Sequence, residues 1–328
     1  MNKSRSDRRR FFGEGISHLN RKYEICLYPG TECASSAIAA HSVQNNGILD
    51  RLAEGGHVIS PRIQIALSDE PPKYKFERIG RNKATTFTGL CGKHDTELFK
   101  PIDTSPIDLS SAEHLFLLAY RSVLKEAHAT RKSVMDTQGL YKLGAKYGQY
   151  SLDAPSEPGM LAVEQMINAY LVEETKRHFD SAYLATNWVA LRHTILPLKT
   201  PPCLAVSSML SMDLYSTHAD GPAYVALNVF PHDDYTVSVF SCLAEDKIQM
   251  AERFGTLFAA SGPYQLYELS KLMLQRCENL VIAPRHYDSF SSRQRQAIEE
   301  YFCKNTGGHE FKVESPEIFL FGPVGPQQ

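Results

Sequence analysis

The sequence predicts an α+β protein, and three observations carry that prediction. Residues 23–105 hold short strand patterns around a group of cysteines and histidines. Residues 106–185 repeat apolar side chains at helical spacing, and residues 186–328 begin with apolar strands and end with helices. Strands and helices that gather in separate runs are typical of α+β proteins. With a basic arm at residues 1–22, the chain is expected to comprise four segments.

Composition limits the function classes. The chain has 328 residues, of which 43% are apolar and 22% charged, as in ordinary globular proteins. A net charge of -2 excludes a uniformly basic nucleic-acid coat protein. No apolar run approaches the roughly 18 residues of a membrane span, and the N-terminus lacks a signal-peptide core. We therefore expect a cytoplasmic protein without a membrane partner.

The first 22 residues are locally basic. They contain seven Lys or Arg, among them Arg8, Arg9 and Arg10, against two acidic residues. Such an arm can bind the phosphates of a nucleic acid and release counterions. A solvated terminal tail is the alternative interpretation.

Three of the seven cysteines cluster with a histidine. Cys26 and Cys33 precede Cys91 and His94, and thiolate and imidazole are the ligands that suit a tetrahedral Zn²⁺. These four side chains would complete a structural zinc site. A second set, Cys33, His41, Cys91 and His94, would leave Cys26 spare. The other four cysteines are isolated from one another in the sequence: Cys203, Cys242, Cys277 and Cys303. In a reducing compartment we expect them to be small buried apolar residues.

The segment around these ligands has mixed patterns. We expect strands at 23–27, 57–67 and 74–79, and a helix at 34–53 that ends before Gly55-Gly56. A further helix begins near His94 and Asp95, because an acidic residue suits a helix's first turn. Residues 100–109, with two prolines, read as a linker.

The order Cys26, Cys33, His41, then Cys91-x-x-His94-Asp95 at a helix start resembles the zinc-stapled HNH (ββα-metal) endonuclease fold, a treble clef. The resemblance covers about a quarter of the chain. It departs from the usual pattern in three places. The first ligand pair, Cys26 and Cys33, is widely spaced in the sequence. The second pair is Cys-x-x-His where Cys-x-x-Cys is commoner, and Asp95 stands at a position usually held by histidine.

The resemblance implies roles for individual residues. His41 would be the general base, Asn82 would orient it, and Asp95 or His94 would bind a catalytic Mg²⁺ or Mn²⁺. A neutral imidazole can take a proton from the attacking water, and a carboxylate suits a hard cation. Arg78, Arg81 and Lys83 make the loop around Asn82 basic, which suits a phosphate backbone.

The remaining elements follow from periodicity and turn signals. A helix beginning with the capping box Ser110–Glu113 should run to about residue 132, with a short helix at 140–147. Expected next are a helix at 159–183, strands at 189–198, 203–209, 223–230 and 235–243, helices at 246–258 and 263–275, a strand at 280–283 and a helix at 291–302. Residues 231–234 form the turn of the clearest hairpin.

The leading hypothesis is a metal-dependent endonuclease acting on DNA or RNA, and the resemblance suggests a setting in restriction or phage defence, by analogy alone. The alternative is a non-catalytic zinc module that binds nucleic acid or a partner protein in a multi-component system, with the C-terminal part as sensor or scaffold. A third hypothesis places an active site wholly in the C-terminal part. Substrate, oligomeric state and trigger are not predicted.

Overall fold

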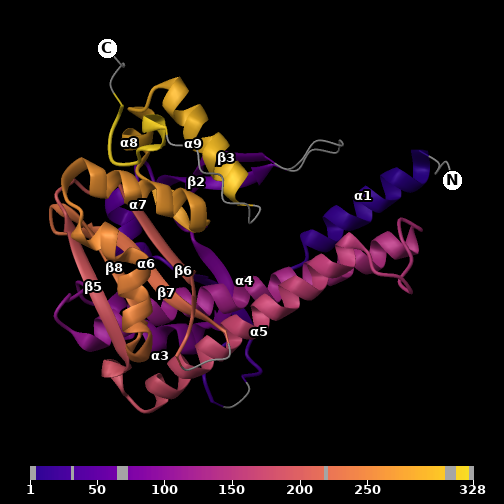
Figure 1. Ribbon diagram of the computed structural model, residues 1–328, viewed down its shortest axis with the longest axis horizontal. Coiled ribbons are helices and arrows are strands. Elements are labelled where there is room, and N and C mark those ends of the chain that lie inside the picture. Colours follow the sequence, from indigo (N-terminus) through magenta and orange to yellow (C-terminus); the bar gives the residue numbers. More distant parts are fainter. Residues whose placement is uncertain (1–4, 31–32, 65–72, 218–220, 307–314, 325–328) are drawn as a thin grey trace.

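The computed structural model describes residues 5–30, 33–64, 73–217, 221–306 and 315–324, and its helices and strands confirm the α+β class (Figure 1). The strands are β1 (Ala37–His41), β2 (His57–Gln64), β3 (Lys73–Gly80), β4 (Thr86–Cys91), β5 (Leu191–Leu198), β6 (Leu204–Tyr215), β7 (Pro222–His232), β8 (Tyr235–Leu243) and β9 (Leu280–Ile282). The α-helices are α1 (Arg5–Leu19), α2 (Asp50–Leu52), α3 (Gly92–Asp103), α4 (Ala112–Lys146), α5 (Glu157–Leu184), α6 (Lys247–Ala259), α7 (Gly262–Arg276), α8 (Pro284–Asp288) and α9 (Ser292–Asn305).

Seven of these strands form one antiparallel sheet in the order β3-β2-β9-β6-β7-β8-β5. The short strand β9 joins its two parts, because Ile282 pairs with Ile59 of β2 on one side and with Leu204 of β6 on the other. Strands from the predicted zinc segment and from the predicted C-terminal segment therefore share a sheet. The predicted boundaries at residues 23–105, 106–185 and 186–328 remain predictions.

Both faces of the central strands are covered, so their sequences are apolar almost throughout. Along β6, Ala205 and Met209 belong to the core on the α4 side, while Val206 and Leu210 belong to the core beneath α6 and α7 (Figure 1). This alternation follows from the two-residue period of a strand. The sheet is thus the middle layer between two helical layers.

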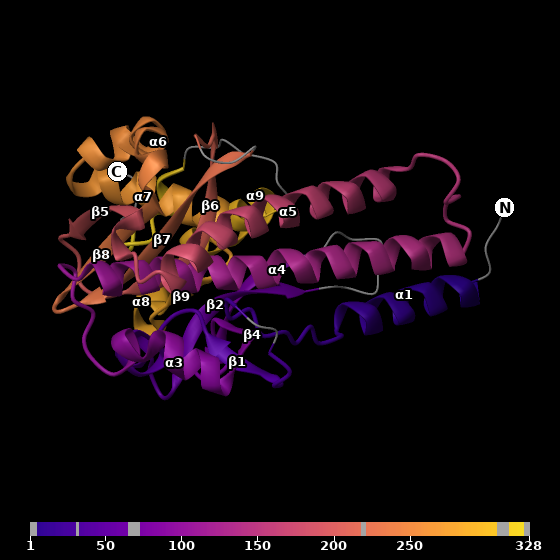
Figure 2. The same ribbon diagram turned by 90° about the horizontal axis from the view of Figure 1, so that it is seen from below.

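Helices α4 and α5 form a long antiparallel hairpin whose outer half extends past the sheet, with α1 beside α4 (Figure 2). Glu14 of α1 accepts a hydrogen bond of 2.8 Å from the Lys146 ammonium and another from the Tyr147 hydroxyl. We call this outer part, residues 5–19 and 125–175, the helical arm. Among the helices that the structure describes, none combines the length and apolarity needed to cross a membrane.

The predicted zinc segment contains a two-stranded sheet of its own. Strands β1 and β4 pair antiparallel, and α3 follows β4 without a gap. The expected strand at 23–27 has no regular assignment, yet the Ile25 and Leu27 amides donate to the carbonyls of Thr88 and Gly89 in β4. The chain therefore runs along β4 on its way to Cys33.

A buried polar contact joins this segment to the large sheet. The Asn279 amide nitrogen donates to the Ser42 hydroxyl and to the Ser207 carbonyl, both at 2.7 Å. Ser207 in turn exchanges a hydrogen bond of 2.8 Å with Ser122 of α4. Because an unpartnered buried polar group is costly, this network fixes how β1 sits against β6.

Besides the strand expected at 23–27, three sequence expectations about secondary structure are wrong. Residues 34–53 form β1, a π-helical turn at 45–49 and the short α2 in place of one helix, because pairing with β4 outweighs the helix propensity of the alanines. Helix α3 extends to Asp103, into the expected linker. The helix capped by Ser111, not Ser110, continues unbroken to Lys146.

The missed continuation of α4 has a packing cause. Gly139 interrupts the helical pattern in the sequence, but a Cβ atom there would lie 2.0 Å from the His18 imidazole of α1. The glycine therefore admits a neighbouring helix and does not end its own. The expected strand at 57–67 is confirmed as far as Gln64, and its last three positions lie outside the described residues.

The later elements were predicted closely. Helix α5, strands β5 to β9 and helices α6, α7 and α9 all occupy the expected places, and the hairpin of β7 and β8 turns at 231–234. Cys203, Cys242 and Cys277 are buried, as expected, whereas Cys303 is half-buried.

Candidate metal centre

The four predicted ligands meet at one point. Cys91 ends β4, His94 lies in the first turn of α3, and Cys26 and Cys33 come from the chain that runs along β4. Their ligand atoms all lie within 4.8 Å of one another. The Cys33 and Cys91 sulfurs are 3.8 Å apart, and the Cys26 sulfur is 3.3 Å from His94 Nδ1. Among the described residues this is the only group of three or more potential ligands so close together.

The spacing fits a tetrahedral cation. With Zn–S bonds of about 2.3 Å, two sulfurs at the corners of a tetrahedron are separated by about 3.8 Å. The observed sulfur–sulfur distance of 3.8 Å equals that separation, and it is far beyond a disulfide bond of about 2.05 Å. A Cys3His donor set of this shape suits a structural Zn²⁺.

Backbone amides support the sulfurs. The Cys91 amide lies 3.4 Å from the Cys26 sulfur, and the His94 amide lies 3.5 Å from the Cys91 sulfur, so each can donate to a thiolate. Burial raises the pKa of the Cys26 thiol, whereas a backbone hydrogen bond at Ser35 lowers the pKa of Cys33. A bound cation would displace the remaining protons, because only thiolates ligate zinc.

Aromatic rings orient the histidine ligand. The Tyr28 ring stacks on the His94 imidazole with centroids 4.0 Å apart and planes 11° apart. Tyr183 of α5 meets Tyr28 edge to face at 6.2 Å. Packing around a ligand in this manner fixes its ring plane, so His94 Nδ1 faces the sulfurs before any cation binds.

His41 lies outside this cluster. It ends β1, and its Nε2 is 3.2 Å from the Arg81 carbonyl oxygen. The ligand set that included His41 and spared Cys26 is therefore not the one that the fold assembles. Burial lowers the pKa of His41, and the positive charge of Arg121 lowers it further, so the ring is neutral near pH 7.

Two residues that the sequence analysis missed, Arg121 and Asp103, lie near enough to His41 for their charges to act on its pKa. Arg121 of α4 is only 3% exposed and donates two hydrogen bonds, of 3.0 and 2.6 Å, to the Asp103 carboxylate at the end of α3. Its guanidinium also covers the Phe99 ring at 3.9 Å. The charges of Arg121 and Asp103 act on the pKa values of both His41 and Asp95.

Asp95 is subject to the same two charges, and we call Asp95, Asp103 and Arg121 the second group. It is half-buried in the first turn of α3, and burial raises the pKa of its carboxyl group. Residues Asp95, Phe99 and Asp103 are spaced at four-residue intervals, so they share one face of α3. That spacing was the signal in the sequence from which Asp103 could have been predicted.

The side chains of the other predicted site residues bond to groups other than His41 or are exposed. Asn82 is exposed, and its side-chain oxygen accepts a hydrogen bond of 3.1 Å from Asn45, while the histidine ring bonds to the neighbouring Arg81 carbonyl. Arg81 and Arg78 form ion pairs with Asp50 and Asp288, and Lys83 is exposed in the turn before β4.

The basic arm lies elsewhere. Arg9 and Arg10 are exposed on α1, within the helical arm, and the Arg8 side chain lies outside the described residues. Figure 2 places α1 along the outer half of α4, away from the two-stranded sheet of β1 and β4. The predicted phosphate-binding residues therefore form two separate groups.

A pocket of about 360 Å³ adjoins the second group. It is bounded by Gln44, by Asp103 and by the turn between β7 and β8, including His232 and Asp233. The Gln44 amide donates to the Ile102 carbonyl at 2.9 Å and so fixes one wall. Parts of the chain nearly 200 residues apart, Gln44 and Asp233, thus meet at this pocket.

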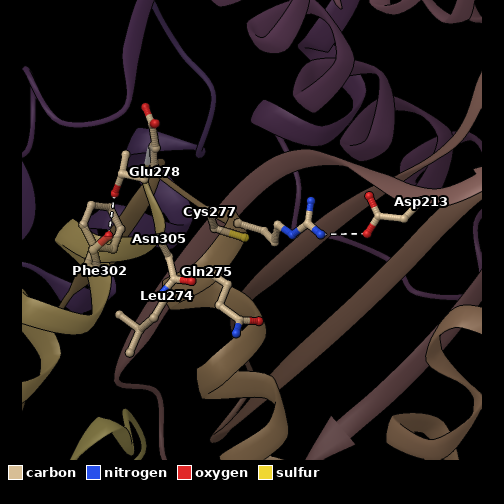
Figure 3. Close-up of a pocket in the computed structure, with 9 residues that line it drawn as sticks. Asp213, Leu274, Gln275, Cys277, Glu278, Phe302 and Asn305 are labelled. Atoms are coloured by element: carbon tan, nitrogen blue, oxygen red, sulfur yellow. Dashed lines mark hydrogen bonds and ion pairs between the residues drawn. The ribbon is translucent and has the colours of Figure 1, made fainter. Parts of the chain in front are cut away.

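A larger pocket of about 620 Å³ lies at the C-terminal ends of α7 and α9 (Figure 3). Arg276 donates to Asp213 at 2.7 Å on one side, and Cys277, Glu278 and Asn305 line the other. Burial raises the pKa of Cys277 to about 12, so its thiol stays protonated and is a poor nucleophile. This pocket offers no reactive group comparable with His41.

The chain matches no protein-family model, no curated protein and no solved structure. Its function must therefore be inferred from the geometry of these groups.

Proposed function

We propose that the chain is a metal-dependent endonuclease that cleaves DNA or RNA, with His41 as its general base and the Cys3His cluster as a structural zinc site. The observation that carries the proposal is the arrangement of β1, β4 and α3. His41 ends β1, Asp95 begins α3, and the cluster clamps the junction of β4 and α3. Two paired strands followed directly by a helix resemble the ββα-metal plan, with β2 and β3 inserted in the chain between the two strands.

The chemistry assigned to His41 fits its hydrogen bond. If Nε2–H donates to the Arg81 carbonyl, Nδ1 carries the free lone pair and can accept a proton from water. The water oxygen then bonds to phosphorus while the bond from phosphorus to the leaving oxygen breaks. The lowered pKa of His41 keeps the ring in its basic form near neutral pH.

Asp95 is the residue of this chain best suited to hold a catalytic cation. Asp103 is engaged by Arg121, whereas Asp95 forms no ion pair among the residues that the structure describes. A bound Mg²⁺ or Mn²⁺ would supply charge stabilisation at the leaving oxygen. Arg121 and Asp103 would keep the Asp95 face of α3 in place.

The test combines zinc content with cleavage. Parent, His41→Ala and Asp95→Asn proteins are analysed for zinc and assayed on plasmid DNA and on RNA with Mg²⁺ or Mn²⁺. We expect one zinc in each protein, cleavage by the parent, and a loss of about 100-fold or more in both variants. His57→Ala, an exposed histidine on β2, is the matched control and should cleave like the parent. Equal cleavage by His41→Ala would refute the assignment of the base.

One observation favours a second function. The described residues bring together only one close set of metal ligands, the Cys3His cluster, and the nearby Asp103 is already neutralised by Arg121. A non-catalytic zinc module that binds nucleic acid or a protein needs nothing more. Under that function neither parent nor variants cleave, and His41→Ala still binds nucleic acid in an electrophoretic mobility assay.

A further inference from the structure

The outer half of α5 exposes a row of large apolar side chains. Its six members are between 48% and 64% exposed: Met160, Leu161, Val163, Met166, Ile167 and Tyr170. Contiguous apolar surface of this kind is unusual on a protein that works alone. We call these six residues the apolar stripe. It lies on the helical arm, which extends from the sheet (Figure 2).

The stripe has the spacing of a helix-packing seam. Met160, Val163, Ile167 and Tyr170 follow one another at intervals of three, four and three residues. That is the a and d pattern of a coiled coil, whose width accommodates one partner helix. The opposite face of α5 is already occupied by α4, and α1 packs against α4. Among the helices and strands that the structure describes, none covers the seam.

The stretch of chain that carries the stripe is acidic. Residues 147–175 contain five acidic side chains and no Lys or Arg. Two of the acids, Glu157 and Glu164, are exposed and form no ion pair among the described residues. Glu173 is partly neutralised by Arg131 of α4. An acidic rim beside an apolar seam complements a helix with basic flanks.

We propose that the apolar stripe binds an amphipathic helix of another protein, with apolar residues along its seam and Lys or Arg on both flanks. A second copy of α5 fits less well. Antiparallel pairing that covers the whole stripe would bring Glu164 close to Glu164 of the second copy, and like charges oppose that contact. The proposed partner is independent of the nuclease proposal, because the stripe and His41 lie on different parts of the fold.

The test uses a synthetic helix in place of the unidentified partner. The probe has three heptads with Leu at a and d and Lys at e and g, and a second peptide carries Glu at e and g. Binding to the full-length chain is measured by fluorescence anisotropy. We expect the Lys peptide to bind at least about tenfold more tightly than the Glu peptide, with affinity falling as salt rises.

Two variants separate seam binding from general charge attraction. Ile167→Glu adds a negative charge, which would strengthen nonspecific binding of a basic peptide, yet we expect it to abolish binding because it places a carboxylate in the seam. Ile248→Glu, at another exposed apolar position, on α6, is the matched control and should bind like the parent. Circular dichroism and zinc content verify that both variants fold.

Three results would overturn the proposal. The Lys peptide could fail to bind the parent, or it could bind Ile167→Glu as tightly as the parent. Alternatively, the parent could be a dimer in sedimentation velocity that Ile167→Glu dissociates and Ile248→Glu does not, in which case a second copy covers the stripe.

Discussion

We call residues 21–41 and 86–103, which surround the four ligands, the Cys3His unit. The interactions that stabilise this unit differ from those that stabilise the seven-stranded sheet. In the sheet, every residue of β8 after Tyr235 is buried, and both faces of β6 and β7 pack against helices. In the unit, most residues from Cys33 to Ala39 are exposed, and the chain from 21 to 28 has no regular structure. The sheet is stabilised by apolar burial on both faces, whereas the unit combines an apolar face, with Leu90 and Phe99 fully buried, with four polar side chains that converge on one point.

This difference predicts that the two regions fail separately. Removing a cation should loosen the chain around the four ligands and leave the sheet folded, because β6, β7 and β8 are held by pairing with one another and by helices on both faces. Acid should affect both regions, but through different groups. The contact through Asn279 is the place where one region can influence the other.

The largest expected effect comes from Cys91→Ser. Cys91 is 1% exposed and supplies a ligand from the end of β4. Structural zinc contributes about 10–16 kcal/mol of binding free energy in small zinc modules, so loss of one ligand should release the ion. We expect zinc content to fall from one to none, and amide exchange to accelerate in residues 21–41 and 86–103 while β7 and β8 stay protected.

Cys203→Ala is the matched control, because Cys203 is equally buried but lies in the core of the sheet. It should keep its zinc and lose only modest stability. If Cys91→Ser instead unfolds the whole chain in one transition, the two regions are a single cooperative unit, and the contrast between them does not hold.

The next effect is a pH dependence that belongs to the sheet. Burial lowers the pKa of His193 on β5 to about 4, its Nδ1 lies 2.8 Å from the Ser241 hydroxyl, and its Nε2 has no hydrogen-bond partner in the described structure. Above pH 6.5 the ring is neutral in both the folded and the unfolded state. As the pH falls from about 6.5 to about 4, the unfolded state binds a proton that the folded state does not, so the free energy of unfolding falls by about 3 kcal/mol.

His193→Gln should remove that part of the acid sensitivity. Urea unfolding at a series of pH values would show a shallower decline between pH 6.5 and 4 than in the parent. His57→Gln, on the exposed end of β2, should follow the parent curve. A decline that is unchanged in His193→Gln would assign the acid sensitivity to other groups, such as the zinc thiolates.

The two regions also differed in how far their sequences predicted them. In the C-terminal part, strand and helix patterns were reliable because each element buries a face, and burial is what apolar periodicity reports. The four cluster residues were predicted by their chemistry alone. The path between them was not, because β1 is an alanine-rich segment whose pairing with β4 no local pattern reveals.

The missed residues share a cause. Arg121 sits in an apolar stretch of α4, where the sequence reads as a core helix, and its partner Asp103 lay in an expected linker. Their pairing depends on how α3 meets α4, which is a tertiary contact. Asn82 was placed against His41 by family resemblance, but the carbonyl of the preceding residue is the ring's hydrogen-bond partner.

The smallest predicted effect lies at the junction of the two regions. Asn279→Ala removes two donors, which leaves the Ser42 hydroxyl and the Ser207 carbonyl without that partner, and such a loss costs about 1–3 kcal/mol. Ser42 also donates its amide to the Thr85 carbonyl at 3.0 Å, next to His41. We therefore expect faster amide exchange at Ser42 as well as a lower free energy of unfolding.

Asn228→Ala is the comparison that decides whether Asn279 is a junction. Asn228 is also buried, but its side chain bonds to Ser122 and to the Leu118 carbonyl, both in α4. Asn228→Ala should lower the free energy of unfolding by a similar amount without changing the rate of amide exchange at Ser42. Because both variants remove one buried amide, a difference confined to Ser42 would trace the coupling to the Asn279 contact. Equal acceleration at Ser42 would mean that β1 responds to the stability of the whole sheet.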